Sequence, residues 1–454
     1  MTNDHELHAY VHAMRRLLGR GGFERTGDPN EARRFRIDHV NAYLDGIGRP
    51  DRRHTVHVAG SKGKGSTAAM VESILRAAGT HTLLLTSPDL HQARERIAID
   101  GAPLGYAAFA AIVERLLDDA AVAAWSYFEL LTVAGWLAGA EAGCDWQVLE
   151  VGLGGRLDTT NAVAQKHVAV IMPIDLEHTE ILGDTYAAIA REKAGIVRGP
   201  CAVVVAPMRA SALDAVREHV AAVGATLHEV PEECALRPLS QTLEGQTFDL
   251  RTPVRTYRAL KLPLLGAHQL ENAAAAVRAA ELAWAAAGPA EGRAELPAAA
   301  VVQGLAGVRW PGRFEVVAGR PLVILDGLHT PLAAKRFAEA ARELALPRPR
   351  VFLVGLLSGK DVDAIAGALG VAGEQVVVVT PASGRAEDPA AVAEAFRAAG
   401  ADVQRAADVR AGLELARALA GERGCVVVAG SLYTVSEARE LVLGIAGDRA
   451  LGLR

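Results

Sequence analysis

The sequence predicts an α/β protein with two sheet-containing units, a larger N-terminal one and a smaller C-terminal one. Apolar, β-branched runs alternate with segments of helical periodicity along most of the chain, which is typical of parallel sheets covered by helices on both faces. The alternation is interrupted between about 240 and 265 and starts again after Trp310. The 454 residues are also enough for two or three domains of about 150 residues each.

In the N-terminal unit, short strands precede helices or glycine-rich turns. Residues 54–60 (HTVHVAG) are a β-branched run that ends in glycine, and residues 66–78 have helical periodicity, with Met70 and Ile74 on one stripe. An Asp-Gly turn predicts a hairpin over residues 95–104. Further strands are expected at 81–87, 146–152, 167–174 and 203–206, and further helices at 106–119 and 127–142.

Residues 240–265 alternate without helical period and predict antiparallel hairpins at the edge of this unit. A long helix is expected at 268–287, followed by a loop at 288–297. The second alternation predicts a Rossmann-like unit, so we expect one domain at 1–309, with an N-terminal helical extension, and another at 310–454. The second has expected strands at 322–327, 351–357, 375–380 and 425–432, and expected helices at 331–345, 388–399, 408–421 and 434–444.

Charge and composition narrow the classes of function. The net charge is −5, whereas a protein whose main partner is nucleic acid usually has a basic face. The four cysteines form no CxxC pair, which fits a reducing compartment and indicates neither a zinc site nor a disulfide framework. No apolar run reaches the roughly 18 residues of a membrane span, and the polar N-terminus does not resemble a signal peptide. We therefore expect a cytoplasmic protein without nucleic-acid or membrane partners.

The segment GSKGKGST (60–67) lies between a predicted strand and a predicted helix, where phosphate-binding loops occur. Its glycines allow backbone N–H groups to approach phosphate oxygens, and Lys64 adds a positive charge. The hydroxyl of Ser66 can bind Mg²⁺ at the helix N-terminus, whose dipole favours an anion. The residue order departs from the usual pattern GxxxxGK(S/T), so a structural turn without a ligand is the alternative to a phosphate-binding loop. The residues of this predicted phosphate site are Gly60, Gly63, Lys64, Gly65, Ser66 and Thr67.

Polar side chains follow several other predicted strands. Glu150 lies in an otherwise apolar strand, where burying a carboxylate is costly without a cation or hydrogen bonds, so it is a candidate Mg²⁺ ligand. His178 follows the next strand, and Asp326 and His329 follow a strand of the second unit. Ligands bind at such carboxyl ends in open α/β sheets. Each residue also has a structural explanation: a salt-bridged glutamate, a structural histidine or ordinary turn chemistry.

Three further polar residues are weaker candidates for the site when each is considered alone. Lys193 lies on an amphipathic helix, where a solvated lysine is the ordinary explanation. Asn272 occupies a helical position otherwise given to alanine, and Arg313 lies at the junction of the two units.

Nine motifs occur in order between about residues 54 and 435. They are AGSKGKGST, TSPDLHQARERI, LEVGLGGRLDTTN, IDLEHTEILGDT, AREKAGIV, GAHQLENAA, WPGRFEV, LDGLHTP and VVVAGSLY. As a set they resemble the folylpolyglutamate synthase/dihydrofolate synthase family of the Mur-ligase superfamily. In that superfamily the phosphate loop places its hydroxyl two positions after the lysine, so the resemblance implies that GSKGKGST is a working variant.

The resemblance implies an ATP-dependent amide ligase. ATP would lie between the two units and transfer its γ-phosphate to the carboxylate of dihydropteroate, of a reduced folate, or of both. The amine of L-glutamate would then attack the acyl phosphate. Two Mg²⁺ ions would assist, one held by Ser66 and Glu150 and the other served by His178, with Ser87 as a further candidate ligand.

The resemblance also implies roles for the remaining candidates. The lysine that matches Lys193 is carbamylated in the superfamily, which would turn a cation into an anion able to support the second metal. Asn272 and Arg313 would contact the nucleotide, and Asp326 its ribose or the phosphates between the units. His329 would lie near the glutamate and the phosphate. The expected catalytic residues are Lys64, His178, Lys193 and His329.

Three departures from the family pattern bear on the substrate. The family usually has TSPHL and DGAHNP, and often GTNGKGS. Asp89 replaces the histidine of the first motif, and it could repel a carboxylate or bind an amine or a metal. The N-terminal region at 33–50, where the family contacts the pterin, fits only loosely. The other differing residues are Ser61, Lys62, Leu328 and Thr330.

Two alternatives stay open at this point. The first is a Mur-type ligase for a non-folate acid or a different amine, which the departures would explain. The second is a catalytically weak nucleotide-binding protein, against which the joint presence of the phosphate, metal and lysine candidates argues. A dehydrogenase is excluded because no first βα turn of the C-terminal unit carries GxGxxG with an acidic residue about 20 positions later. We expect a monomer, since the two units must close on each other.

Overall fold

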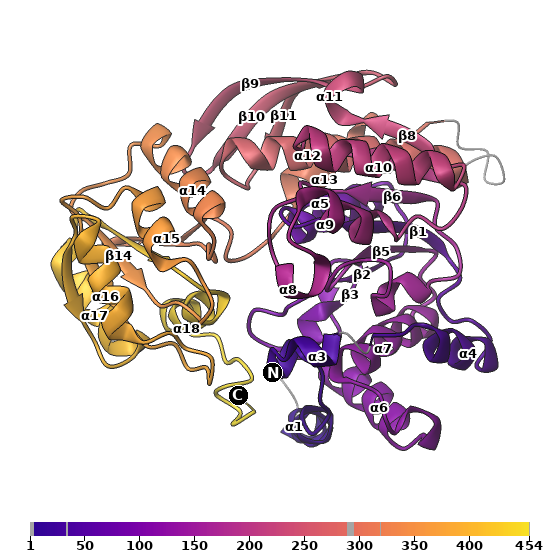
Figure 1. Cartoon of the computed structure of the whole chain (residues 1–454), viewed down its shortest axis with the longest axis horizontal. Helices are drawn as coiled ribbons and strands as arrows, with labels where there is room; N and C mark the ends of the chain where they lie inside the picture. Colours follow the sequence, from indigo (N-terminus) through magenta and orange to yellow (C-terminus); the bar gives the residue numbers. More distant parts are fainter. Residues whose placement is uncertain (1–3, 33–34, 288–294, 318, 454) are drawn as a thin grey trace.

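Figure 1 shows the computed structural model of the chain, in which two sheet-containing units lie beside each other. The structure describes residues 4–32, 35–287, 295–317 and 319–453. The expected loop at 288–297 therefore lies mostly outside the described residues, as do residues 33–34 of the expected pterin-contacting region. The predicted fold class is confirmed: a largely parallel sheet is followed by a separate, smaller α/β unit.

The larger sheet has eight strands in the order β4-β3-β2-β5-β1-β6-β7-β8. The strands from β2 to β8 in this order run parallel, and β3 and β4 form the predicted hairpin at one edge. The strands are β1 (His54–Ala59), β2 (Thr82–Leu85), β3 (Ile97–Ile99), β4 (Ala102–Pro103), β5 (Trp146–Glu150), β6 (Val168–Ile171), β7 (Ala202–Val205) and β8 (Thr226–Glu229).

Helices cover both faces of this sheet because successive side chains of a strand point to opposite sides. Val56 and Val58 of β1 belong to the core beneath α5, α12 and α13. Ala59 of the same strand belongs to the core of the other face, with α9 and α10. The helices are α5 (Lys64–Ala77), α6 (Tyr106–Leu117), α7 (Tyr127–Glu141), α8 (Thr179–Leu182), α9 (Tyr186–Ala194), α10 (Ala210–Ala222), α11 (Val230–Glu233), α12 (Ala267–Ala287) and α13 (Ala298–Gly307).

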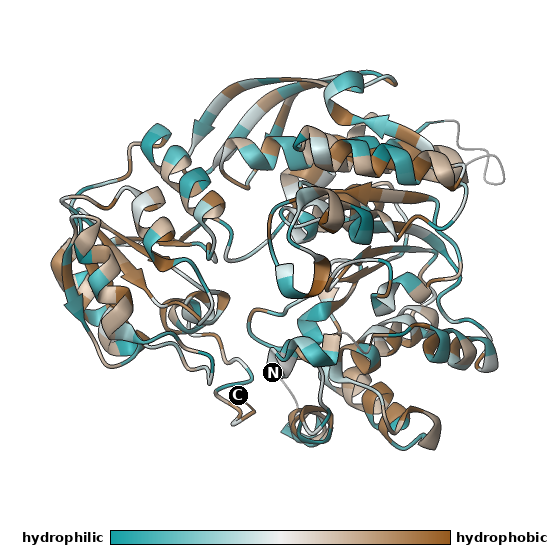
Figure 2. Ribbon diagram, viewed as in Figure 1, coloured by the Kyte–Doolittle hydropathy of each residue, from teal (hydrophilic) through white to brown (hydrophobic). Residues whose placement is uncertain are grey.

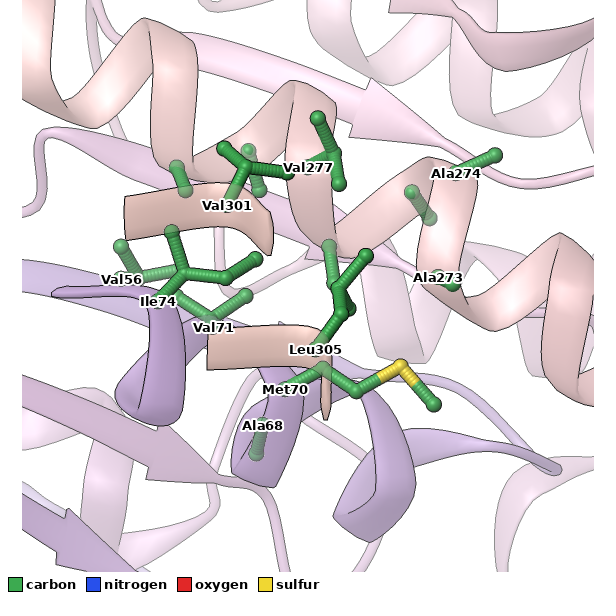
Figure 3. Close-up of a cluster of buried hydrophobic side chains, with 14 of the residues drawn as sticks. Val56, Ala68, Met70, Val71, Ile74, Ala273, Ala274, Val277, Val301 and Leu305 are labelled. Atoms are coloured by element: carbon green, nitrogen blue, oxygen red, sulfur yellow. The ribbon is translucent and has the colours of Figure 1, made fainter. Parts of the chain in front are cut away.

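The helix that follows the phosphate loop, α5, is deeply packed. Its residues Met70 and Ile74 belong to one hydrophobic core with Val277 of α12 and Leu305 of α13 (Figure 3). At Gly304 the backbones come close, because an added Cβ there would lie 2.5 Å from the Cα of Ile74. The first turn of α5, which carries the loop, is therefore fixed by a rigid core.

Further elements extend the N-terminal unit at its two sides. The N-terminal helical extension packs through Tyr10 and Met14 into the core that contains α6 and α7. The predicted antiparallel hairpins are found as a three-stranded sheet in the order β11-β10-β9, which lies over α12 (Figure 1). These elements are α1 (Asp4–Leu18), α2 (Phe23–Thr26), α3 (Pro29–Ala32), α4 (Asp38–Gly46), β9 (Ala235–Thr242), β10 (Gly245–Arg251) and β11 (Thr256–Leu262).

The C-terminal unit has six strands in the order β12-β13-β17-β14-β15-β16, with β12 antiparallel to β13 and the others parallel. Figure 2 shows hydrophobic strands between helices of mixed hydropathy. The elements are β12 (Glu315–Val317), β13 (Leu322–Leu325), α14 (Pro331–Glu343), β14 (Arg350–Val354), α15 (Val362–Leu369), β15 (Gln375–Val378), α16 (Pro389–Ala398), β16 (Asp402–Arg405), α17 (Val409–Ala420), β17 (Cys425–Ala429) and α18 (Leu432–Leu443). Within the described part of the chain, every helix is too short or too polar to cross a bilayer.

Candidate active site

A cavity of about 510 Å³ lies between the two units, beside the carboxyl ends of strands from both sheets. The fold brings most of the predicted site residues together here, although they come from distant parts of the chain. Those that line the cavity are Gly63, Lys64, Gly65, Ser66, Ser87, Glu150, His178, Lys193, Asn272, Arg313, Asp326 and His329.

The phosphate loop keeps its shape through contacts behind it. The N–H groups of Ser61 and Lys62 both donate to the carbonyl oxygen of Pro173, at 2.9 and 3.2 Å. Gly63 has a φ of 83° and precedes α5, and an added Cβ there would lie 2.5 Å from Oδ1 of Asn272. Because α5 begins at Lys64, the N–H groups of its first turn have no carbonyl partner within the helix and suit an anion.

Two residues that sequence reasoning did not single out support this loop. An added Cβ at Gly65 would lie 2.5 Å from the indole ring of Trp310. Gln269 donates through Nε2 to Oγ of Ser66 at 3.4 Å, and it accepts from Nδ2 of Asn272 at 2.9 Å. Trp310 and Gln269 belong to the motifs WPGRFEV and GAHQLENAA. Their contacts with the loop depend on how α12 and the segment between α13 and β12 pack against it, which the sequence alone does not indicate.

Gly60 and Thr67 are not among the residues that line the cavity. The carbonyl oxygen of Gly60 accepts from Nζ of Lys193 at 3.0 Å. Thr67 is fully buried, and its Oγ1 lies 3.5 Å from Sδ of Met172, to which it donates. Both residues therefore shape the loop from below, and their contact with a nucleotide stays a prediction.

Glu150 is the last residue of β5 and lies beside the phosphate loop, since the parallel register pairs it with Val58. Its side chain is buried, and Oε2 accepts from the backbone N–H of Ser87 at 3.1 Å. Burial raises the pKa of Glu150, while the positive charge of Lys64 opposes that rise. Among the described residues Glu150 forms no ion pair. It is thus a buried carboxylate with little compensation from the protein itself.

Lys193 is buried within an ion-pair network that the sequence did not reveal. Its Nζ lies 3.2 Å from Oε1 of Glu177, whose Oε2 lies 3.2 Å from Nζ of Lys62. Burial lowers the pKa of Lys193 to about 8, and Glu177 opposes that shift. Burial alone would raise the pKa of Glu177. The positive charges of Lys193, Lys64 and Lys62 outweigh that effect and hold its pKa well below the usual range. Glu177 therefore stays ionised and links the loop to α9.

Two histidines face the cavity from opposite units. Burial lowers the pKa of His178 to about 4 and that of His329 to about 4, so both rings are neutral near pH 7. Nδ1 of His329 donates to the carbonyl oxygen of Gly327 at 2.8 Å, which leaves Nε2 as an acceptor. A neutral imidazole nitrogen can accept a hydrogen bond or bind a metal.

Asp326 and Arg313 meet at the junction of the units. The carboxylate of Asp326 accepts from the N–H groups of Phe314 and Leu328, each at 2.8 Å. Burial raises the pKa of Asp326, and the charge of Arg313 opposes that rise. These bonds tie the segment that carries Arg313 to the end of β13, so both side chains are held at the cavity wall.

The residues that depart from the family pattern lie in different settings. Asp89 is buried outside the main cavity, and its Oδ1 accepts from Nε of Arg96 at 2.6 Å. It therefore binds a guanidinium, a role that the sequence did not suggest. Leu328 is buried in the C-terminal core, and Thr330 caps α14 by accepting from the N–H of Ala333 at 3.4 Å.

The side chains of Glu150 and Ser66 are suited to bind a magnesium ion. Mg²⁺ prefers oxygen ligands, which Glu150 and Ser66 offer, and a cation would relieve the cost of burying the carboxylate. The described residues contain no group of three or more His, Cys, Asp or Glu side chains that could hold a metal. This agrees with the habit of Mg²⁺ of using one or two carboxylates together with water and substrate phosphates. His178 offers nitrogen, which is a less typical ligand for this ion.

Comparison with known proteins assigns each of the two units to a known type of domain. Residues 58–280 match the model of the Mur ligase middle domain, and residues 312–432 match that of the Mur ligase glutamate ligase domain. The dihydrofolate synthase/folylpolyglutamate synthase of Mycobacterium tuberculosis is 34% identical over 443 residues, which cover 89% of this chain and 89% of that protein. The solved structure of M. tuberculosis folylpolyglutamate synthase complexed with ADP superposes with a TM-score of 0.85 at 31% identity, covering 96% of this chain and 99% of that one.

Longer relatives also match. The chain spans about half the length of two relatives, from Halobacterium salinarum and Haloferax volcanii, that are named probable bifunctional folylpolyglutamate synthase/dihydropteroate synthase. The one from Halobacterium salinarum is 38% identical over 397 residues, which cover 85% of this chain and 46% of that protein. Both family models and the nearly full-length matches agree with the motif order in the sequence. The chain belongs to the folylpolyglutamate synthase/dihydrofolate synthase family of the Mur ligases.

Proposed function

We propose that this protein is an ATP-dependent ligase that joins L-glutamate to the carboxylate of dihydropteroate, of a reduced folate, or of both. The observation that carries the proposal is that the phosphate loop and Glu150 of one unit line the same cavity as Asp326 and His329 of the other. The names of its relatives support the choice of acid and amino acid.

The nucleotide is bound by residues from both units. Lys64 and the N–H groups of the first turn of α5 bind the phosphates, and Asn272 and Arg313 contact the nucleotide. Asp326 accepts a hydrogen bond from the ribose or orients Arg313 toward the phosphates. Phosphoryl transfer asks for positioning and charge neutralisation rather than covalent chemistry by the protein, which is what these residues supply.

Ser66 and Glu150 would hold one Mg²⁺, and His178 would serve a second, with Ser87 close to Glu150. When bound, Mg²⁺ neutralises phosphate charge during acyl phosphate formation. The hydroxyl of Ser66 already has an orienting partner in Gln269, which lies 3.4 Å away.

The acid and the amine use different walls of the cavity. Aromatic residues of the N-terminal unit (Phe23, Phe35, Tyr127 and Phe128) line one wall and suit a flat pterin ring. On the C-terminal side, Lys360 is near enough to His329 for its charge to help lower the pKa of that histidine, after the larger effects of burial and Lys62. We assign Lys360 and His329 to the carboxylates and the amine of L-glutamate.

The acid is tested by ADP release from purified protein with Mg²⁺ and ATP. Dihydropteroate, tetrahydrofolate and non-pterin acids are compared with and without L-glutamate. We expect glutamate-dependent release with at least one pterin acid. Release with a non-pterin acid alone would support the other candidate, a Mur-type ligase with a different acceptor, for which the replacement of the family's histidine by Asp89 is the motivating feature.

Lys193 is proposed to act as its carbamate. The neutral amine attacks CO₂, an N–C bond forms, and the displaced proton leaves to solvent, so a pKa lowered to about 8 favours the reaction. The neutral fraction rises with pH through that value, so activity at limiting bicarbonate should rise between about pH 7 and 9. Lys193→Ala should lose most activity and regain part of it with short-chain carboxylic acids. Unchanged turnover in that variant would leave Lys193 a structural partner of Glu177.

The remaining expectations are kept as proposals. Residues 1–309 and 310–454 are two domains, which agrees with the end of α13 at Gly307 and the start of β12 at Glu315. We infer a cytoplasmic monomer, since one chain supplies residues to both walls of the cavity. Its partners are then small molecules rather than nucleic acid.

A further inference from the structure

A second cavity, of about 330 Å³, adjoins the candidate active site. Its lining includes no residue of the phosphate loop, so it extends away from the site of phosphoryl transfer. Side chains of both units form the junction between the two cavities. The residues that line both are Glu24, Pro88, Tyr127, Arg385, Leu432 and Tyr433.

One of the arginines near this junction already has its charge compensated. Arg96 is buried, and its Nε lies 2.6 Å from Oδ1 of Asp89 while its Nη1 lies 2.9 Å from Oε2 of Glu24. The guanidinium also lies over the ring of Tyr127, with 5.2 Å between its carbon and the ring centre. Two carboxylates around one guanidinium leave little attraction for a further anion.

Arg385 is placed differently. It is exposed, and among the described residues it forms no ion pair. Its loop is fixed because the carbonyl oxygen of Arg385 accepts from the N–H of Ser358 at 2.8 Å. The guanidinium reaches the end of α2, where Nη1 lies 3.5 Å from the position that a Cβ of Gly27 would take.

The charges that act on Lys360 are mostly positive. The pKa of Lys360 is lowered, first by burial, then by the charge of Lys62 and, more weakly, by that of Arg385, while Glu177 opposes the shift. Arg385 thus adds a cation near Lys360 and Lys62, which have one carboxylate, that of Glu177, acting with them. An anionic group of a ligand is the natural partner.

We propose that Arg385 binds the free carboxylate that each glutamyl residue of a folate acceptor carries, with the second cavity giving room to longer glutamyl tails. This rests on the proposed function. The incoming L-glutamate does not need this additional space, whereas each round of ligation lengthens the acceptor by one residue. The guanidinium of Arg385 lies beside Gly27, the residue that follows α2, and α2 begins at Phe23, one of the aromatic residues assigned to the acceptor. A guanidinium can hold a carboxylate through two parallel hydrogen bonds, which a lysine cannot do.

The test compares Arg385→Ala and Arg385→Lys with the wild type on three acceptors: dihydropteroate, which has no glutamyl residue, and tetrahydrofolate with one and with three. Arg385→Ala should raise the KM for the triglutamate by about 10- to 100-fold and that for dihydropteroate by a clearly smaller factor. Arg385→Lys should recover part of the loss. Arg397→Ala, an exposed arginine of α16, serves as the control and should leave all three KM values unchanged.

Three results would overturn this assignment. The first is an equal rise in KM for all acceptors, and the second is a rise confined to the KM for L-glutamate. The third is a wild-type enzyme that accepts dihydropteroate but no glutamylated folate. If the wild type used no pterin acid at all, the proposed function itself would fail, which is distinguishable from these three.

Discussion

Lys64→Ala is expected to reduce glutamate-dependent ADP release by at least about 10³-fold, a loss comparable to removing a main charge-stabilising group in a water-excluded site. Lys64 follows directly on Gly63 at the start of α5 and lines the cavity. It is the loop lysine without a carboxylate within ion-pair distance among the described residues, whereas Lys62 is paired with Glu177. Its charge is therefore available to the phosphates. The measurement is steady-state ADP release at saturating ATP.

The charge of Lys64 stabilises the buried carboxylate of Glu150 but repels the buried amine of Lys193. Because these two effects oppose each other, the thermal midpoint without nucleotide should change little. Lys261→Ala, an exposed lysine of β11, is the matched control and should keep normal turnover. Addition of ATP and Mg²⁺ should raise the midpoint of the wild type more than that of Lys64→Ala. Near-normal turnover of Lys64→Ala would remove this lysine from the reaction and leave the loop a structural turn.

The sequence predicted those parts of the fold whose side chains are buried in a regular pattern. β1, β5 and β6 are apolar runs, and they were predicted together with α5. In contrast, β8 and β16 lie at sheet edges with half-buried or exposed side chains, and their sequences TLHE and DVQR contain one apolar residue each, too few to predict a strand. Edge strands are positioned by backbone pairing with a neighbour, which a local sequence pattern does not encode.

The candidate site was predictable to the extent that its residues follow strands. Glu150, His178, Asp326 and His329 all stand where a strand ends, and the fold brings them to one cavity. Glu177 also follows β6, directly before His178, but its importance depends on Lys193 and Lys62, which lie elsewhere in the chain. Arg385 could not be identified from its strand, because its position beside Gly27 depends on the packing of the two units. Asp89 shows the same limit: its partner Arg96 stands in the same motif, but the ion pair depends on the turn between them.

Glu150→Gln is expected to lower turnover by at least about 100-fold while the protein stays folded, which would separate its chemical role from its structural one. Glutamine has nearly the same shape, and its side-chain oxygen can still accept the N–H of Ser87, but it cannot offer the negative charge that a magnesium ion requires. The measurement is ADP release across a range of Mg²⁺ concentrations. A loss that high Mg²⁺ fully restores would indicate weakened binding, and unchanged turnover would contradict the metal role.

The pH dependence of stability gives the same residue a second test without substrates. Burial raises the pKa of Glu150 in the folded state, so folding favours the protonated carboxyl. Its contribution to stability is therefore present below the unfolded pKa of about 4.3 and is lost as pH rises through the folded value. Glutamine does not titrate, so the thermal midpoint of Glu150→Gln should exceed that of the wild type more at pH 8 than at pH 5. Glu232→Gln, at an exposed position of α11, should show no such difference. Mg²⁺ with a nucleotide should raise the thermal midpoint of the wild type more than that of Glu150→Gln. The reason is that the cation neutralises the buried negative charge of Glu150, whereas glutamine carries no charge to neutralise.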